Sequence, residues 1–132
     1  MHRVVLDTNV IVSAALTSTG NPAKLIELVS DGEIVLYYSK EMLEEYEDVF
    51  SREKLGFSLE AQRAAISMIT EKGILVTPVK SDTPFSDMDD LIFFDTAKAA
   101  DAYLITGNTK HYPTEAFIKT PAQFLGLINF QV

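Results

Sequence analysis

Short apolar runs alternate with helical patterns along this chain, and that alternation constrains the fold more than any other feature. Each run is rich in β-branched or aromatic residues and is bounded by turn or cap signals, as buried strands are. Such alternation favours an α/β fold with a parallel sheet, in which ligands bind outside the carboxyl ends of the strands. Pro78 predicts that the third strand ends there or lies at a sheet edge. The expected strands cover residues 3–7, 34–39, 74–79, 102–106 and, more weakly, 117–120.

The helical patterns carry start and stop signals. Asn21 is expected to cap a helix whose first residue is Pro22, and Ser39 and Ser58 are expected to cap the next two. Two consecutive helices therefore separate the second strand from the third. The expected helices cover residues 21–32, 39–53, 58–73, 89–102 and 120–128.

Composition limits the class of protein. The chain has 132 residues, 47% of them hydrophobic, and no apolar run approaches the roughly 20 residues of a membrane span. The absence of cysteine excludes disulfides, thiolate zinc sites and cysteine nucleophiles. The N-terminus enters an apolar strand without the organisation of a signal peptide. We therefore expect one soluble, cytoplasmic domain over residues 1–132.

The net charge of −8 argues against a large basic surface for gripping duplex nucleic acid. It does not exclude nucleic acid, because an acidic site can meet phosphate through a bound divalent cation. The same acidity also suits a basic protein partner, or serves only solubility.

Carboxylates stand where strands end or helices begin. Asp7 directly follows the first strand, and a buried carboxylate is costly unless something pairs with it. The simpler interpretation is a cap of a local turn or of the next helix. Asp87, Asp89 and Asp90 form a second group, of which helix capping explains one or two. Acids this close repel one another, so the group is a candidate metal shell, and Asp95 could lie near the same face.

The helix that begins after Ser39 offers further acids. Its apolar stripe places Glu44 and Asp48 on the solvent side. Glu45 and Glu47 flank the stripe on its two sides, and periodicity does not choose between them.

Asn108 follows the fourth strand and would alone pass for a turn residue. Together with Asp7, one flanking glutamate and one or two acids of the second group, it is expected at one edge of the sheet. Oxygen ligands with few histidines suit Mg²⁺ or Mn²⁺. Such ions activate water and neutralise charge on a reacting phosphoryl group.

Four segments carry a resemblance to a known family: VVLDTNVIVSA, SKEMLEEYEDV, DMDDLIFF and DAYLITGNTKHYP. In this order and spacing they resemble the PIN domain, and more closely its VapC-like branch of toxins from toxin–antitoxin systems. The resemblance spans residues 3 to 125. It implies a three-layer α/β/α sandwich with a parallel sheet of about five strands. It also implies, as in many members, a Mg²⁺- or Mn²⁺-dependent ribonuclease.

The resemblance assigns residues as well. It matches Asp7, Glu45 and Asp90 to the first three acids of the family site, and so selects Glu45 over Glu47. Asn108 stands where most PIN domains carry a fourth acid, which removes one formal charge. The supporting residues that the resemblance implies are Thr8, Asn9, Thr106, Asp87 and Asp89.

These matches predict a mechanism of phosphodiester hydrolysis in single-stranded RNA. Asp7 and Asp90 are expected to hold the ion, with Glu45 binding it directly or through water, and Asn108 to orient a water or a phosphate oxygen. Weaker candidates for contacting substrate phosphates, each of which also suits a solvated turn, are Lys110, His111, Arg52 and Lys54.

Two other readings keep an α/β fold. One is a catalytically weak binding or regulatory module, and the other is a phosphoacceptor receiver domain, which the lack of an aspartate at the end of the third strand disfavours. As a toxin the protein would need a cognate antitoxin, and a homodimer is possible. Tyr37, Tyr46 and Phe50 could serve such contacts, although core packing is the simpler interpretation for each.

Overall fold

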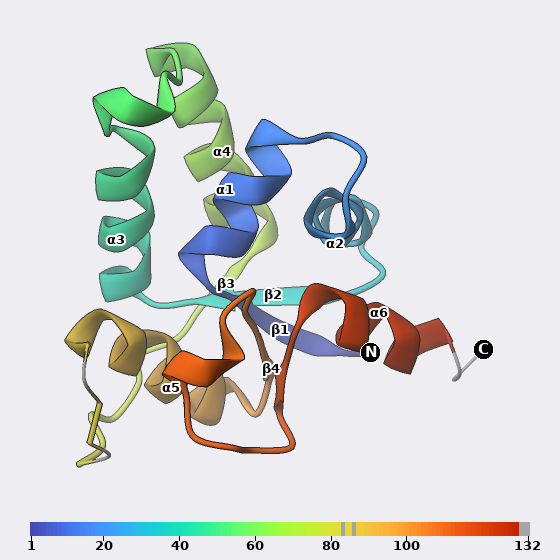
Figure 1. The fold of residues 1–132 in the computed structure, drawn as a ribbon, viewed down its shortest axis with the longest axis vertical. Helices are drawn as coiled ribbons and strands as arrows, with labels where there is room; N and C mark the ends of the chain where they lie inside the picture. Colours follow the sequence, from blue (N-terminus) through green and yellow to red (C-terminus); the bar gives the residue numbers. More distant parts are fainter. Residues whose placement is uncertain (83, 86, 130–132) are drawn as a thin grey trace.

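Five parallel strands form the central sheet, in the order β3-β2-β1-β4-β5 (Figure 1). The computed structural model describes residues 1–82, 84–85 and 87–129. The predicted parallel α/β sheet is confirmed. The strands are β1 (Arg3–Leu6), β2 (Val35–Tyr38), β3 (Ile74–Leu75), β4 (Tyr103–Ile105) and β5 (Ile118–Lys119).

The chain reverses its direction across the sheet between β1 and β4. From β1 the chain first moves to β2 and β3, and it later returns to the other side of β1 with β4 and β5. The register pairs Val4 with Tyr103 and Leu6 with Ile105, so both strands end at the same level. Such a switch point is where open α/β sheets bind ligands. The strand order also differs from the 2-1-3-4-5 order of flavodoxin-like folds, which makes the receiver-domain reading wrong.

Helices cover both faces of the sheet (Figure 1). Helix α5 lies alone on one side, where it packs against β1, β2 and β4, and α1 to α4 lie on the other. Helix α6 packs against α2 and β5. These layers agree with the predicted three-layer sandwich. The helices are α1 (Thr8–Leu16), α2 (Asn21–Ser30), α3 (Lys40–Phe50), α4 (Leu59–Lys72), α5 (Met88–Ala100) and α6 (Pro121–Asn129), with short 3₁₀ turns η1 (Glu53–Leu55) and η2 (Thr109–His111).

Two predicted helix caps are present and one is wrong. The hydroxyl of Ser39 accepts a hydrogen bond from the Met42 backbone N–H at 3.3 Å, and Ser58 caps α4 in the same way. Asn21 is not a cap, because α2 begins at Asn21 itself and Gly20 precedes it as the capping residue. The Gly20 carbonyl accepts the first helical hydrogen bond, from Lys24.

Helix α1 was not expected from the sequence. Its run of Val10, Ile11 and Val12 is β-branched and follows a strand without a break, so it resembles a continuation of that strand. Asp7 ends the strand with extended backbone angles, and its carbonyl accepts a hydrogen bond from Val10 at 3.0 Å. Asp7 is therefore the N-cap residue of α1, in agreement with the simpler interpretation, but its side chain makes no capping hydrogen bond.

The third strand is short and peripheral, as Pro78 predicts. Strand β3 ends at Leu75 and forms one edge of the sheet. The weakly expected last strand is present as β5, at the opposite edge.

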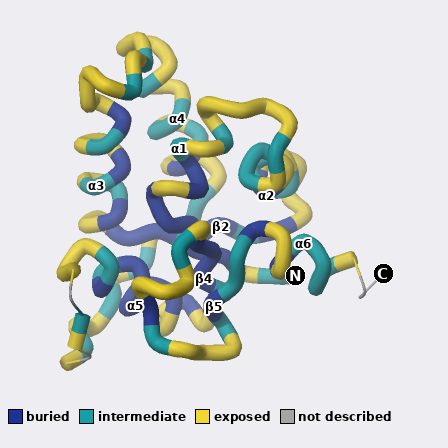
Figure 2. The backbone as a smooth tube through the Cα atoms, viewed as in Figure 1, coloured by how far each residue is buried: buried dark blue, intermediate teal, exposed yellow. Residues whose placement is uncertain are grey.

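The core lies between the sheet and its two helix layers (Figure 2). Tyr46 and Phe50 of α3 are fully buried in it, so they do not form surface contacts with a partner. Tyr37 is half-buried, with the Arg3 guanidinium 5.9 Å from its ring centroid. Of the helices in the described part of the chain, none is both long and apolar enough to cross a membrane.

Candidate active site

A pocket of about 450 Å³ opens at the carboxyl ends of β1 and β4. It draws residues from both sides of the sheet: the β1–α1 junction, α3, the start of α5 and the turn after β4. Most of the residues expected at the site line this pocket, namely Asp7, Thr8, Asn9, Glu45, Asp87, Asp89, Asp90, Asn108 and His111. Arg52 and Lys54, from the α3–α4 connection, complete the rim.

Asp7 is the buried centre of this pocket. Its side-chain Oδ2 accepts hydrogen bonds from the Thr106 hydroxyl at 2.7 Å and the Tyr112 hydroxyl at 3.2 Å. Its backbone N–H donates to the Ile105 carbonyl, which continues the pairing of β1 with β4. Burial raises the pKa of Asp7 above its usual value, and these two hydroxyls only partly offset that effect.

The turn after β4 is fixed by a short chain of hydrogen bonds. The Thr106 hydroxyl accepts from the Asn108 backbone N–H at 3.1 Å while it donates to Asp7. The Asn9 side-chain oxygen accepts from the Gly107 N–H at 3.2 Å. Helix α1 and the turn are therefore tied together beside Asp7.

Glu45 reaches the pocket because α3 is anchored to the end of β1. The hydroxyl of Tyr46, the next residue, donates to the carbonyl of Leu6, directly before Asp7. Glu45 is half-buried, and burial, followed by the negative charge of Asp89, raises its pKa. Glu47 is exposed and lines a separate groove between α3 and α4. Of the two glutamates that flank the stripe, the pocket therefore contains Glu45.

The acids at the start of α5 differ in their contacts. Asp87 is the helix cap, and its carboxylate accepts from the Asp89 N–H at 2.9 Å. Asp90 points to the pocket with a side chain that is only 14% exposed, and the His111 Nδ1 atom lies 3.5 Å from its Oδ2. Burial, together with repulsion from Asp7 and Asp87, raises the pKa of Asp90 to about 6. The negative charge of Asp7 therefore acts on Asp90 across the pocket.

Asn108 contacts a histidine rather than a carboxylate. Its side-chain amide nitrogen lies 3.0 Å from the Nε2 atom and 3.4 Å from the Nδ1 atom of His111. The Nδ1 atom also lies 3.5 Å from Oδ2 of Asp90, so the imidazole contacts both Asn108 and Asp90. The neutral amide therefore places His111 against the acidic wall of the pocket.

Comparison with known proteins identifies the family. The family model described as PIN domain matches residues 3–110. The chain belongs to the PIN domain family. An uncharacterized protein of Methanocaldococcus jannaschii, MJ1680, is 30% identical over 109 residues, which is 80% of this chain and 70% of that protein.

Membership of the PIN family, which the sequence motifs indicated, is thus confirmed, and PIN domains are generally metal-dependent nucleases. The family match does not extend to the VapC-like branch, to a particular metal or to a particular substrate.

The pocket of this PIN domain has the donor types for a hard cation but not a closed set of ligands. Among residues 1–82, 84–85 and 87–129, no group of three or more His, Asp or Glu side chains is assembled closely enough to hold a metal ion. Yet the carboxylates lining the pocket are oxygen donors that raise one another's pKa, and a cation would reverse that repulsion.

Thr8 adds a second indication of a ligand. Thr8 lines the pocket and, in the part of the chain that the structure describes, its hydroxyl is a buried side-chain polar atom without a hydrogen-bond partner. A buried hydroxyl left unpaired costs about 1–3 kcal/mol. A water or a bound ligand beside Asp7 would remove that cost, so the residues present fit a hydrated divalent ion.

Two expected residues lie elsewhere. Asp95 is buried on α5, where its carboxylate accepts from the Ser81 N–H at 3.2 Å, so it does not share the face of Asp90 in the pocket. Lys110 is exposed and lines a neighbouring depression with Thr109 and Tyr112.

Tyr112 was not identified as a site residue from the sequence. Its only signal in the sequence was an aromatic residue before a proline.

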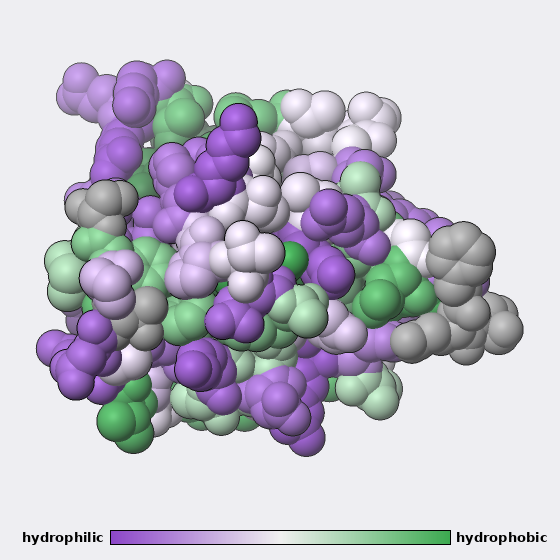
Figure 3. Space-filling model, turned by 60° about the horizontal axis from the view of Figure 1, so that its bottom comes forward, coloured by the Kyte–Doolittle hydropathy of each residue, from purple (hydrophilic) through white to green (hydrophobic). Residues whose placement is uncertain are grey.

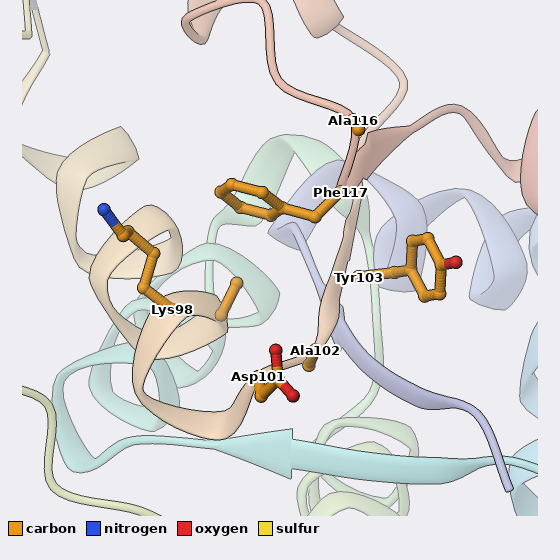
Figure 4. A pocket seen from close by; sticks show the side chains of 7 residues that line it. Lys98, Asp101, Ala102, Tyr103, Ala116 and Phe117 are labelled. Carbon is orange, nitrogen blue, oxygen red and sulfur yellow. The ribbon is translucent and has the colours of Figure 1, made fainter.

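A second cavity, of about 510 Å³, lies at the opposite end of β4 (Figure 4). Its charged side chains are one cation, Lys98, and one carboxylate, Asp101, and the Phe117 ring projects toward α5. This pairing does not offer several carboxylates for a divalent ion, as the pocket around Asp7 does. On the face drawn in Figure 3, hydrophobic residues form several areas separated by hydrophilic ones.

Proposed function

We propose that this PIN domain is a metal-dependent endoribonuclease that hydrolyses single-stranded RNA, and that it is the toxin of a toxin–antitoxin pair. The observation that carries the proposal is the convergence of Asp7, Glu45 and Asp90 on one pocket at the switch point of the sheet. Each of these three carboxylates has a pKa raised first by burial. A divalent ion would stabilise their charged forms.

The roles follow from the positions of the side chains. Asp7 and Asp90 would hold a Mg²⁺ or Mn²⁺ ion, with Glu45 binding it directly or through water. When bound, the ion would supply an activated water and neutralise charge on the phosphate. Asn108 and His111 would orient a phosphate oxygen or a water at the wall of the pocket.

The few cations around the pocket favour a flexible single strand of RNA as the substrate. Arg52 and Lys54 supply cations to the pocket, which His111 also lines, and Arg52 is paired with Asp48 at 3.1 Å. Lys110 follows on the adjoining surface, one residue before His111. With a net charge of −8 the chain offers these few local cations for phosphates rather than the broad basic surface that duplexes require.

The finer assignments rest on the sequence resemblance. A cognate antitoxin would neutralise the enzyme in the cytoplasm. The net charge of −8 of this chain suits a basic segment of such a partner. The protein would also form a homodimer, as toxins of this branch commonly do.

The test is cleavage of an unstructured RNA in the presence of Mn²⁺ by wild type and Asp7→Asn. Cleavage should be lost in the variant. The matched control is Asp101→Asn, the same change at the far end of β4, where the left-handed backbone (φ 51°) suits asparagine. Equal cleavage by wild type and Asp7→Asn would trace the activity to a contaminant and remove the proposal.

A second candidate is a PIN-fold binding or regulatory module with a weak or inactive site. It is favoured by Asn108 in place of a fourth acid and by the open arrangement of the carboxylates. Calorimetry with Mn²⁺ separates the two, since a module without catalysis needs no ion. Failure to bind Mn²⁺ at millimolar concentration supports the module and excludes the nuclease.

A further inference from the structure

We propose that Tyr112 is a positioning residue, whose hydroxyl acts with that of Thr106 to hold the Asp7 carboxylate in one orientation. Both hydroxyls donate to the same oxygen, Oδ2, at 3.2 Å and 2.7 Å. Within the described part of the chain, no side chain donates to Oδ1, although the Thr8 backbone also stabilises the charged carboxylate. The two hydroxyls therefore hold the carboxylate through one oxygen, which leaves the other for a ligand in the pocket.

Two donors constrain the carboxylate more than one. A single hydroxyl lets a carboxyl group rotate about its terminal bond, since that torsion is broad in aspartate. Donors from two different segments fix its plane. Thr106 approaches from the end of β4, and Tyr112 from the residue after η2. The pair thus defines the direction in which Oδ1 faces.

Tyr112 is itself held firmly enough to act in this way. Its side chain is 7% exposed, and its backbone N–H donates to the Thr109 carbonyl at 3.1 Å. Its ring meets Phe85 edge-on, with ring centroids 5.8 Å apart, and Phe85 packs on Phe94 of α5 at 5.3 Å. Tyr112 therefore connects Asp7 to the segment that carries Asp87 and Asp90.

The competing explanation is that Tyr112 only fills space. Its ring would then matter and its hydroxyl would not, so phenylalanine would serve equally well. A hydroxyl that only filled space would not need to reach a buried carboxylate that already has a donor in Thr106. The two explanations differ at one atom, which makes them separable by a single substitution.

The consequence for metal binding rests on the proposed function, whereas the orientation of Asp7 does not. The experiment compares wild type, Tyr112→Phe and the control Tyr103→Phe. Tyr103 is half-buried at the start of β4, beside the far cavity, and in the described region its hydroxyl makes no hydrogen bond (Figure 4). Three properties are measured: the metal-free crystal structure, Mn²⁺ affinity by calorimetry, and kcat and KM for RNA.

In Tyr112→Phe we expect the Asp7 carboxylate to adopt more than one orientation. Mn²⁺ should bind about 10- to 100-fold more weakly, as is typical when a partner of a metal ligand is removed. The kcat should fall while KM for RNA stays near wild type, because substrate contacts are untouched. Tyr103→Phe should match wild type in all three properties.

A single, unchanged orientation of Asp7 in Tyr112→Phe would overturn the inference. If wild type neither binds Mn²⁺ nor cleaves RNA, the proposed nuclease function fails. The metal-free structures would still decide whether Tyr112 positions Asp7, because that comparison needs no ion.

Discussion

The hydroxyl of Thr106 lies 2.7 Å from Oδ2 of Asp7, although 99 residues separate the two in the sequence. This bond joins the ends of two strands on either side of the switch point. It also satisfies a carboxylate that burial makes costly to ionise. The most buried acid of the pocket thus depends on a partner contributed by the last third of the chain.

Replacing Thr106 with valine should destabilise the protein. Valine has a similar shape but lacks the donor to Asp7, and a buried acceptor that loses a partner costs about 1–3 kcal/mol. Denaturant unfolding measures the loss. The control is Thr77→Val, at an exposed position beyond β3, which should change the free energy of unfolding little. Equal stability of Thr106→Val and wild type would mean that the bond contributes nothing to folding.

Without a metal ion, stability should fall as the pH rises from about 4 to about 6. The pKa of Asp90 is raised to about 6 from 3.8, so the folded state binds a proton more tightly than the unfolded state. Its stabilising contribution is complete below the unfolded pKa and is lost as the pH passes through the folded pKa. Burial raises the pKa of Asp7 and Glu45 in the same direction.

Melting temperatures measured across this pH range, with EDTA and with Mn²⁺, check this prediction. Because an ion binds the deprotonated carboxylates, Mn²⁺ should raise the melting temperature above pH 6 and have little effect near pH 4. Asp90→Asn should flatten the metal-free profile. A profile that rises with pH between 4 and 6 in EDTA would contradict the assignment of the pKa shifts.

Asn108→Asp should strengthen Mn²⁺ binding. It restores a carboxylate where the neutral amide now contacts His111, and it adds a charged oxygen to the wall of the pocket. In EDTA the same change should lower stability, since the new charge lies near Asp90. Calorimetry and thermal unfolding report the two effects. Asn21→Asp, which adds the same charge on α2, is the control.

Weaker Mn²⁺ binding by Asn108→Asp would mean that Asn108 positions something other than the ion. The amide contact with His111 would then be its main role.

Glu45→Gln should reduce RNA cleavage by more than about tenfold, whereas Glu47→Gln should not. The two glutamates lie on the same helix, but only the first of them lines the pocket around Asp7. Paired assays of the two variants under identical Mn²⁺ conditions make this comparison. Similar losses in both would indicate a general effect of removing negative charge from α3.

Sequence patterns predicted much of the fold because its strands and most helices carry local signals. Ser39 and Ser58 begin helices with caps that can be read from the chain. Helix α1 escaped prediction because Val10, Ile11 and Val12 favour a strand locally, and the tertiary fold overrides that preference. Propensity in a short segment does not reveal where the sheet ends.

The candidate site was only partly predictable for a related reason. Periodicity gave the buried face of α3, but which flanking glutamate enters the pocket depends on how that helix is anchored to β1 by Tyr46. The role of Tyr112 could not be inferred, since its bond to Asp7 spans 105 residues and an aromatic residue before a proline does not indicate such a contact. Contacts between distant segments are set by topology, which a local motif does not encode.

The partners of Asp7 also determine when the site can form during synthesis. A nascent chain that has released β1 and α1 still lacks Thr106 and Tyr112, which lie 99 and 105 residues downstream. Closing loops of that length is slow, and β4 cannot pair with β1 before it has left the ribosome. A chain that ends before these residues therefore holds Asp7 without its two hydroxyl donors, and the pocket is completed only after Tyr112 has emerged.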